Sequence, residues 1–172
     1  MPKVEAGSRT LWGRTTPFPT DAVAKARASM KRGSAFNVRI FQRTNGWIGS
    51  RWRIGRKFLR GIPVCLLTNT GRRSGQARIS PLLFLQRGPD TVVVASQGGM
   101  PRHPDWYHNL VADPAVRLHL PHQAEFAATA RVVDDDERAA LWPELVELYP
   151  SFAVYQARAE RVIPVIVCSP VS

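Results

Sequence analysis

P-V-C-L-L-T at residues 63–68 and A-R-I-S-P-L-L-F-L-Q at residues 77–86 flank the polar stretch N-T-G-R-R-S-G-Q at residues 69–76. Two apolar runs of this length, separated by asparagine and glycine, predict two β-strands joined by a loop. Pro81 indicates an edge or a bulge in the second strand, because proline donates no hydrogen bond to a neighbouring strand. The loop is too short for a helical crossover, so the two strands are expected to run antiparallel.

The sequence that follows this pair repeats the same alternation of apolar runs and turns. Further strands are predicted at residues 91–96, 115–120, 124–133 and 162–167, and a short helix at residues 104–111. The connections between most strands are too short for parallel βαβ units. The expected fold is therefore mainly β with helices attached, as a small and mostly antiparallel barrel.

One longer helix is predicted after residue 134. Asp134, Asp135 and Asp136 stand at its N-terminal end, where carboxylates interact favourably with the helix dipole. Its apolar residues recur at helical spacing, at Leu141, Trp142, Leu145, Leu148, Tyr149 and Phe152. Pro143 predicts the start of a fresh turn, since proline is unfavourable in a helix interior.

The positive charge of the chain is concentrated in its first third. The 172 residues carry a formal net charge of +11, and residues 1–60 hold 14 lysines and arginines against only Glu5 and Asp21. This asymmetry predicts a basic N-terminal segment at residues 1–60, followed by one domain at residues 61–172. It favours an anionic partner, which is a nucleic acid, an anionic membrane surface or a polyanionic small molecule.

The N-terminal segment also contains apolar and aromatic residues. A short helix is predicted at residues 21–30, and residues 35–59 mix apolar side chains with arginine and lysine. Two interpretations stay open for the second stretch: an interface-seeking segment, or a core-packing segment whose cations reach solvent. Asn45-Gly46 and Gly49-Ser50 interrupt it, so one continuous helix is not expected.

Several function classes lack their signatures. Two cysteines cannot build a disulfide scaffold, and the four histidines have no spacing typical of a metal site. A Rossmann glycine motif, a Walker loop and a nucleophile elbow are absent. No run of about 18 apolar residues occurs, and the first twenty residues lack the apolar region of a signal peptide, so a cytoplasmic location is expected.

Three polar clusters are the candidate binding residues: the first lies between two predicted strands, the second follows a predicted strand, and the third lies at the start of a predicted helix. They lie at residues 68–78, 95–99 and 103–109, and contain glycines, arginines, hydroxyl groups and two aromatic rings. Glycines permit close backbone approach, and arginines bind oxyanions through paired hydrogen bonds. A flat aromatic ligand with an anionic tail would use all three clusters, whereas the alternative for the first one is a mobile hairpin tip.

At these clusters the chain resembles the deazaflavin-dependent nitroreductases, also called F420-dependent quinone reductases. The matching motifs are T-G-R-R-S-G-Q-A-R-I-S-P-L (70–82), V-V-A-S-Q-G-G (93–99), H-P-D-W-Y-H-N-L (103–110), L-Y-P-S-F-A-V-Y-Q (148–156) and I-P-V-I-V-C-S-P near the C-terminus. The resemblance covers about residues 60–170 and implies a split β-barrel that binds coenzyme F420, a deazaflavin with a phosphate and an oligoglutamate tail.

The resemblance also implies which residues form the site. Its cofactor-binding positions are Arg72, Arg73, Ser74, Arg78, Ile79, Ser80, Pro81, Leu82, Leu83, Val94, Ala95, Ser96, Gln97, Asp105, Trp106, Tyr107, His108, Asn109 and Phe152. Its catalytic candidates are Ser96, near the reacting centre, and Tyr149 and Tyr155, on the acceptor side. The alternatives are a turn serine and two tyrosines that only pack a helix. No metal is expected.

The sequence departs from the family pattern at three of these positions. Phe152 and Leu83 stand where nitroimidazole-activating members carry tyrosines, and Gln97 replaces a common lysine. These departures bear on nitro-compound activation and on one contact to the cofactor tail.

The implied activity is hydride transfer from reduced F420 to a quinone or nitroaromatic acceptor. Residues 1–60 would then lie on the anionic inner membrane surface or form a lid over the acceptor. The other hypotheses are a flavin-mononucleotide- or haem-binding split barrel and a basic nucleic-acid-binding protein, although motifs for the latter are absent.

Overall fold

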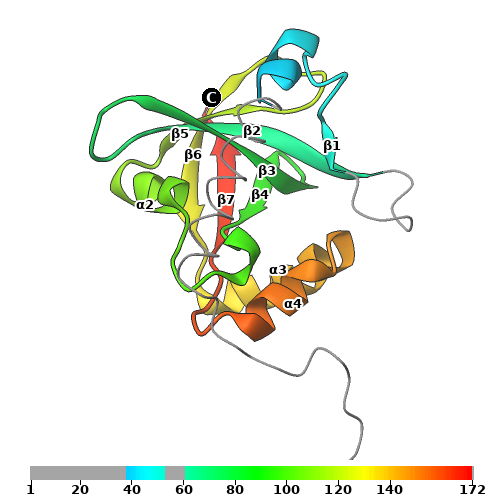
Figure 1. Cartoon of the computed structure of the whole chain (residues 1–172), viewed down its shortest axis with the longest axis vertical. Coiled ribbons are helices and arrows are strands. Elements are labelled where there is room, and N and C mark those ends of the chain that lie inside the picture. Colours follow the sequence, from blue (N-terminus) through cyan, green and yellow to red (C-terminus); the bar gives the residue numbers. More distant parts are fainter. Residues whose placement is uncertain (1–37, 53–60, 172) are drawn as a thin grey trace, which may run out of the picture.

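The computed structural model describes residues 38–52 and 61–171. The strands are β1 (Arg51–Trp52), β2 (Ile62–Thr70), β3 (Ala77–Arg87), β4 (Asp90–Val94), β5 (Ala115–His119), β6 (Phe126–Val132) and β7 (Val165–Pro170). The helices are η1 (Gln97–Gly99), α2 (Asp105–Ala112), α3 (Asp135–Leu148) and α4 (Ser151–Arg158). Strands β2 to β7 form an antiparallel barrel, with α2 beside it and α3 and α4 packed below it in Figure 1. The predicted mainly β barrel is confirmed.

The barrel closes through β2, which pairs with β3 on one side and β5 on the other. The remaining neighbours follow in the order β3, β4, β7, β6 and β5. Strand β3 changes partner along its length: Leu83 is its last residue paired with β2, and Phe84 its first paired with β4. Pro81 pairs with Leu66 in the half of β3 that has only β2 as its strand neighbour, so the predicted edge position is confirmed.

Two apolar clusters stabilise the barrel. Side chains inside it include Cys65, Leu67, Leu118 and Ile166, all fully buried. A second cluster joins the outer barrel face to the helices, among them Ile62, Val92, Leu141, Leu145 and Ile163. Successive strand residues point to opposite faces, so each strand supplies both clusters. Cys65 and Cys168 are free thiols, and burial strongly raises the pKa of Cys65, which keeps it protonated.

Helix α3 begins as the sequence predicts, but the expectation for Pro143 is wrong. The Asp134 carboxylate accepts a hydrogen bond of 2.8 Å from the backbone N–H of Glu137, which caps the helix. Pro143 lies inside α3, although it cannot donate a backbone hydrogen bond. Leu141 and Leu145 are buried on either side of it, so their packing holds the helix together.

The C-terminal part of the predicted apolar face belongs to a second helix. Tyr149 ends α3, and α4 begins at Ser151 after Pro150. The last strand starts at Val165, three residues later than predicted. The residues of the link just before it form hydrogen bonds with partners outside the sheet. Within that link, the N–H of Ile163 donates to the side chain of Gln156, and the carbonyl of Pro164 accepts from Ala95.

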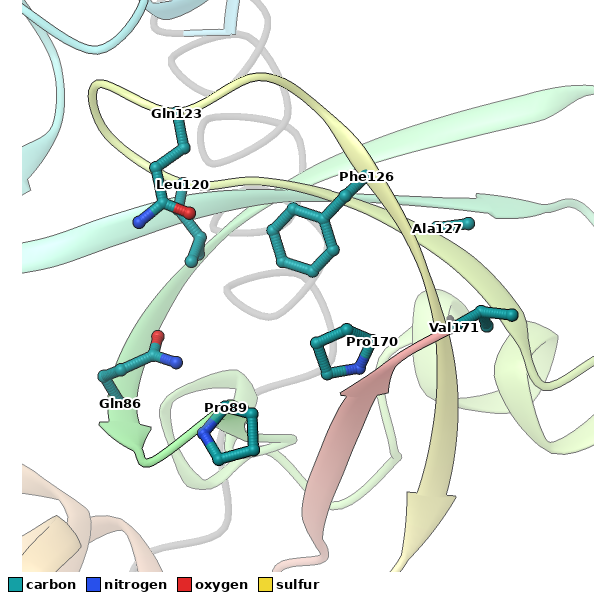
Figure 2. Close-up of a pocket in the computed structure, with 8 residues that line it drawn as sticks. All are labelled: Gln86, Pro89, Leu120, Gln123, Phe126, Ala127, Pro170 and Val171. Atoms are coloured by element: carbon teal, nitrogen blue, oxygen red, sulfur yellow. The ribbon is translucent and has the colours of Figure 1, made fainter.

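The connections that carry helices emerge from one end of the barrel. These are residues 95–114, between β4 and β5, and residues 133–164, between β6 and β7. The opposite ends of β4 and β7 border a pocket of about 340 Å³. Figure 2 shows Pro89 and Gln86 on one side of this pocket, with Leu120, Gln123 and Pro170 around it. It contains none of the predicted site residues.

Residues 38–50 of the N-terminal segment pack on the pocket end of the barrel. Residues 38–44 are helical, and Val38 and Phe41 form a buried cluster with Leu66. A Cβ added at Gly46 would lie 2.8 Å from the Cα of Pro121, so this turn approaches the β5–β6 loop closely. The helix predicted at residues 21–30 lies outside the described residues, and the division at residue 60 stays a prediction.

Candidate functional site

The glycine-rich loop between β2 and β3 is an ordered turn. Gly71 donates its N–H to the carbonyl of Gln76 at 2.8 Å, and its own carbonyl accepts from Ser74 and Gly75. A Cβ added at Gly71 would lie 2.9 Å from the Ser74 hydroxyl and 3.2 Å from the carbonyl of Gln76, so a larger residue would be crowded there. The closed turn exposes Arg72 and Arg73 to solvent. The hydrogen bonds close the turn, and the alternative of a solvated hairpin tip without a ligand stays open.

Arg72 connects this loop to helix α2. Both its backbone N–H and its Nη1 donate to Oδ1 of Asn109 at 3.2 Å, and Nη1 lies 3.5 Å from the carbonyl of Asp105. Asn109 is buried, although Arg72 is exposed. Asn69 adds a second connection, since its Nδ2 donates to the carbonyl of Trp106 at 2.8 Å. The first and third polar clusters of the sequence therefore form one surface.

Arg78 extends the cationic surface of the loop onto β3. Its Nη2 donates to the Ser74 hydroxyl at 3.3 Å and to the side chain of Gln76 at 3.2 Å. Arg72, Arg73 and Arg78 are all exposed, and together they place three guanidinium groups on one six-residue turn and its strand. Such a group of paired donors suits a phosphate or carboxylate.

The β3 residues after Arg78 cannot all face one ligand. Leu82 packs against the cluster inside the barrel, whereas Leu83 packs against the cluster under α3 and α4. This follows from the alternation of side chains along a strand. Ile79, Ser80 and Pro81 are exposed or half-buried beside the loop.

The first accessible side chain after β4 is that of Ser96. Val94 and Ala95 are buried, and both backbone groups of Ala95 are engaged, its N–H by the carbonyl of Pro164 and its carbonyl by Arg161. Ser96 is half-buried and precedes η1, but its hydroxyl does not cap that helix. Gln97 and Gly98 follow with φ of 46° and 66°, and nothing lies within 4 Å of a Cβ added at Gly98. The hydroxyl thus stands beside an open stretch of backbone.

Gly99 brings this segment against α4, where the predicted acceptor-side tyrosines lie. A Cβ added at Gly99 would lie 2.7 Å from the carbonyl oxygen of Tyr155. The hydroxyl groups of Tyr149 and Tyr155 are 3.1 Å apart and form a hydrogen bond. Tyr149 is buried and Tyr155 half-buried, so Tyr155 is the outer member of the pair. Burial first, and the Tyr149 hydrogen bond second, raise the pKa of Tyr155 to about 12.

Phe152 lies behind these tyrosines. Its ring is buried in the outer cluster and contacts Tyr149 edge to face, with ring centroids 5.1 Å apart. The ring also lies near Trp142 and Tyr155. Its direct contact with a ligand stays a prediction.

The first turn of α2 carries the remaining aromatic candidates. Asp105 is exposed, and Trp106, Tyr107 and His108 are half-buried. Trp106 and Tyr107 pack partly against the inner barrel cluster, so each ring has one face in the core. The Tyr107 ring also lies 4.7 Å from His103, which precedes the helix.

Arg161 is a site residue that the sequence did not reveal. It lies between α4 and β7, and its guanidinium contacts His103 and the backbone between Ala95 and Arg102. A lone arginine before a strand has no motif, and its partners are mostly carbonyls, which a sequence does not display. Burial, followed by the charge of Arg161 and then His108, lowers the pKa of His103, so its ring is neutral near pH 7.

The fold and these motifs match known proteins. Residues 34–170 match the F420H(2)-dependent quinone reductase family. An F420H(2)-dependent quinone reductase of Mycobacterium tuberculosis is 37% identical over 131 residues, which cover 74% of this chain and 83% of that protein. A solved F420-H2 dependent reductase is 38% identical with a TM-score of 0.58, covering 62% of this chain and 94% of that one.

A second solved structure, described as a domain-swapped dimer, is 34% identical with a TM-score of 0.60. It covers 78% of this chain and 95% of its own. The family match extends over more than three quarters of the present chain and includes the glycine-rich loop, Ser96, α2 and α4. The chain therefore belongs to the F420H(2)-dependent quinone reductase family.

Proposed function

We propose that this protein is an oxidoreductase that transfers a hydride from reduced coenzyme F420 to a quinone. The observation that carries the proposal is the link between the arginine-bearing loop and α2, made by Asn109 and Arg72. It gives an anion-binding surface that continues into the segment of Ser96. Family membership supports the same cofactor and acceptor class.

The residues present fit the chemical groups of F420. The arginine cluster offers donors for the phosphate and the carboxylates of the tail, and no carboxylate forms a salt bridge with it among the described residues. Nothing lies within 4 Å of a Cβ added at Gly75 or Gly98, so the backbone there is open to a ligand. When bound, the reduced deazaflavin supplies the hydride.

The protein residues would bind and orient the cofactor and donate hydrogen bonds or a proton to the reacting groups. Arg72, Arg73 and Arg78 would hold the anionic groups, and Ser96 would donate a hydrogen bond beside the ring. Tyr155, the outer member of the tyrosine pair, would donate a hydrogen bond or a proton to the acceptor oxygen as charge develops on it. The loop would therefore determine the affinity for F420, and Tyr155 on α4 would determine the turnover rate.

The cofactor assignment predicts saturable binding of oxidised F420 that flavin mononucleotide does not displace. The measurement is a titration followed by the intrinsic fluorescence of F420, with the flavin added as competitor. Because charged groups hold the tail, the affinity should fall as the salt concentration rises. Displacement by the flavin, or a Soret band in the purified protein, would instead support the flavin- or haem-binding alternative.

For the acceptor we propose a quinone in preference to a nitroaromatic compound. Phe152 and Leu83 provide no hydroxyl groups on this side of the site, whereas Tyr149 and Tyr155 provide two that form a hydrogen bond with each other. A quinone oxygen needs one donor as it becomes an oxyanion, which Tyr155 can supply. A screen of quinones and nitro compounds at equal concentration would rank the two classes.

We further propose that the protein associates with the anionic inner face of the membrane through Trp47 and Ile48. Their side chains are 80% and 61% exposed on one turn, and the exposed Arg43 and Arg51 flank that turn. Exposed aromatic and apolar groups among cations favour a lipid headgroup region. The turn lies at the pocket end of the barrel, and the alternative of a lid over the acceptor stays a prediction. No helix in the described residues is long and apolar enough to span a membrane.

Ile48→Ser is expected to reduce co-sedimentation with vesicles containing anionic lipid several-fold. Each buried apolar side chain contributes about 1.5–3 kcal/mol to such partitioning when fully transferred. Val111→Ser is the matched control, because Val111 on α2 is 59% exposed but lies away from this turn. Equal loss in both variants, or wild-type binding that does not depend on anionic lipid, would refute the membrane surface.

A further inference from the structure

The guanidinium of Arg161 forms a compact group of contacts at the centre of the candidate site. Nε donates to the carbonyl of Met100 at 3.1 Å, and Nη1 lies 2.9 Å from Nδ1 of His103. Nη2 donates to the carbonyls of Ala95 and Ser96 at 3.2 and 3.1 Å, and lies 3.5 Å from that of Arg102. All three nitrogens of the side chain therefore form contacts, and all their partners lie within residues 95–103.

This arginine is half-buried without a carboxylate partner among the described residues. Burial lowers the pKa of Arg161, because a charged guanidinium loses hydration when it is buried. Arginine nevertheless stays charged, so its burial costs free energy. Among the described residues, its hydrogen-bond partners are dipoles, namely four backbone carbonyls and a neutral imidazole. An arginine that only packs on the surface would leave its guanidinium in water and would not need these hydrogen bonds.

The contacts join elements that are distant along the chain. Ala95 and Ser96 follow β4, while His103 precedes α2 and packs on Tyr107 at 4.7 Å between ring centroids. Helix α2 in turn holds Arg72 through Asn109. A single side chain thus ties the Ser96 segment to the helix that orients the arginine-bearing loop.

The same contacts orient the backbone. In a trans peptide the C=O and the following N–H point in opposite directions. Since the carbonyls of Ala95 and Ser96 point at the guanidinium, the N–H groups of Ser96 and Gln97 point away from it. The face of the segment opposite Arg161 therefore carries backbone donors.

We propose that Arg161 is a positioning residue of the F420 site, whose guanidinium fixes residues 95–103 so that Ser96 meets the bound cofactor. This inference rests on the proposed function. Arg161 does not touch the cofactor, and it acts through the backbone that it holds. Its fork geometry is required, because a lysine has one nitrogen and cannot reach the same carbonyls and the histidine together.

The test compares Arg161→Gln and Arg161→Lys with the wild-type protein. Because a misplacement of about 1 Å can cost on the order of 100-fold in rate, we expect kcat to fall roughly 100-fold in Arg161→Gln. Arg161→Lys keeps the charge and the fold but loses the fork, and should still lose roughly tenfold. Arg131→Gln is the control: Arg131 on β6 forms a paired contact with Glu137 on α3, outside the site.

Two readouts do not require a loaded enzyme. The pKa of His103, followed by NMR, should rise in Arg161→Gln, because the charge of Arg161 now helps to lower it. Tyr107 and His108 also contact this ring and remain in all variants. Amide hydrogen exchange of residues 95–103 should become faster in both variants and stay unchanged in Arg131→Gln.

The outcomes separate the two proposals. Wild-type kcat and unchanged exchange in both Arg161 variants, with normal F420 binding, would overturn the role of Arg161 alone. If Arg161→Gln does not fold, Arg161→Lys decides by the same criteria. Failure of the wild-type protein to bind F420 would overturn the proposed function together with this inference, whatever the exchange data show.

Discussion

Asn109→Ala is expected to weaken F420 binding roughly tenfold, because a tenfold change in affinity corresponds to the contribution of about one charge-assisted hydrogen bond. Oδ1 of Asn109 is the acceptor for both the backbone N–H and Nη1 of Arg72, each at 3.2 Å. Without it, Arg72 loses the contacts that hold its guanidinium beside α2, and ordering it on the ligand costs conformational entropy. The fluorescence titration measures the affinity, and kcat at saturating F420 should change little.

Asn69→Ala is the matched control for this experiment. Asn69 is also a buried asparagine that connects β2 to α2, but it donates to the carbonyl of Trp106 and leaves Arg72 in place. Its Oδ1 has no hydrogen-bond partner among the described residues. Both variants should lose on the order of 1 kcal/mol of stability, because each removes side-chain hydrogen bonds between the β2–β3 region and α2. A tenfold loss of affinity in Asn69→Ala as well would show that α2, and not Arg72, limits binding.

The barrel could be predicted from the sequence because its strands are marked locally. Residues 63–68 and 77–86 alternate or run apolar between glycines and asparagines, and the structure has strands there, extended by one or two residues. The cap at Asp134 is likewise a local signal that the structure confirms. Closure of β2 onto β5 is not local, since it depends on pairing residues about 50 positions apart.

The parts that the sequence did not reveal depend on tertiary contacts. Pro143 is tolerated inside α3 because buried leucines on both sides compensate the missing hydrogen bond. Arg161 acts on carbonyls, so no spacing of residue types indicates it. The opposite packing of Leu82 and Leu83 follows from strand alternation, and this signal was available in the sequence.

The resemblance placed the loop, α2 and α4 at one site, and the structure shows the contacts that join them. Arg72 meets Asn109 across 37 positions of sequence, and Gly99 meets Tyr155 across 56. These contacts join segments that are distant along the chain. Phe152 is buried and packs edge to face on Tyr149, and its direct contact with a ligand stays a prediction.

Tyr155→Phe is expected to lower kcat for quinone reduction on the order of 100-fold, the usual contribution of a positioned proton donor. Tyr155 is the half-buried member of the hydroxyl pair, and burial raises its pKa to about 12 from an ordinary 10.0. The hydroxyl therefore stays protonated across the physiological range and can donate to the acceptor. The affinity for F420 should be unchanged, and the solvent isotope effect on turnover should decrease in the variant.

The raised pKa also fixes the sign of the pH dependence. A folded-state pKa above the unfolded value favours the neutral hydroxyl in the native protein, so this contribution to stability is complete below about pH 10 and is lost as the pH rises toward 12. The wild-type protein should thus show no loss of kcat from this group below about pH 10. A fall in kcat centred near pH 8 would have to arise from another group.

Tyr149→Phe and Ser96→Ala decide between the candidate donors. Tyr149 is buried behind Tyr155, so its removal leaves the outer hydroxyl in place and should cost less than Tyr155→Phe. If the proton comes from Ser96 instead, Ser96→Ala at saturating cofactor would show the larger loss and Tyr155→Phe almost none. Retention of wild-type turnover in both Tyr155→Phe and Tyr149→Phe would make the pair a packing contact between α3 and α4. A loss confined to Tyr155→Phe would assign proton donation to the one hydroxyl that is both outermost and held protonated by its surroundings.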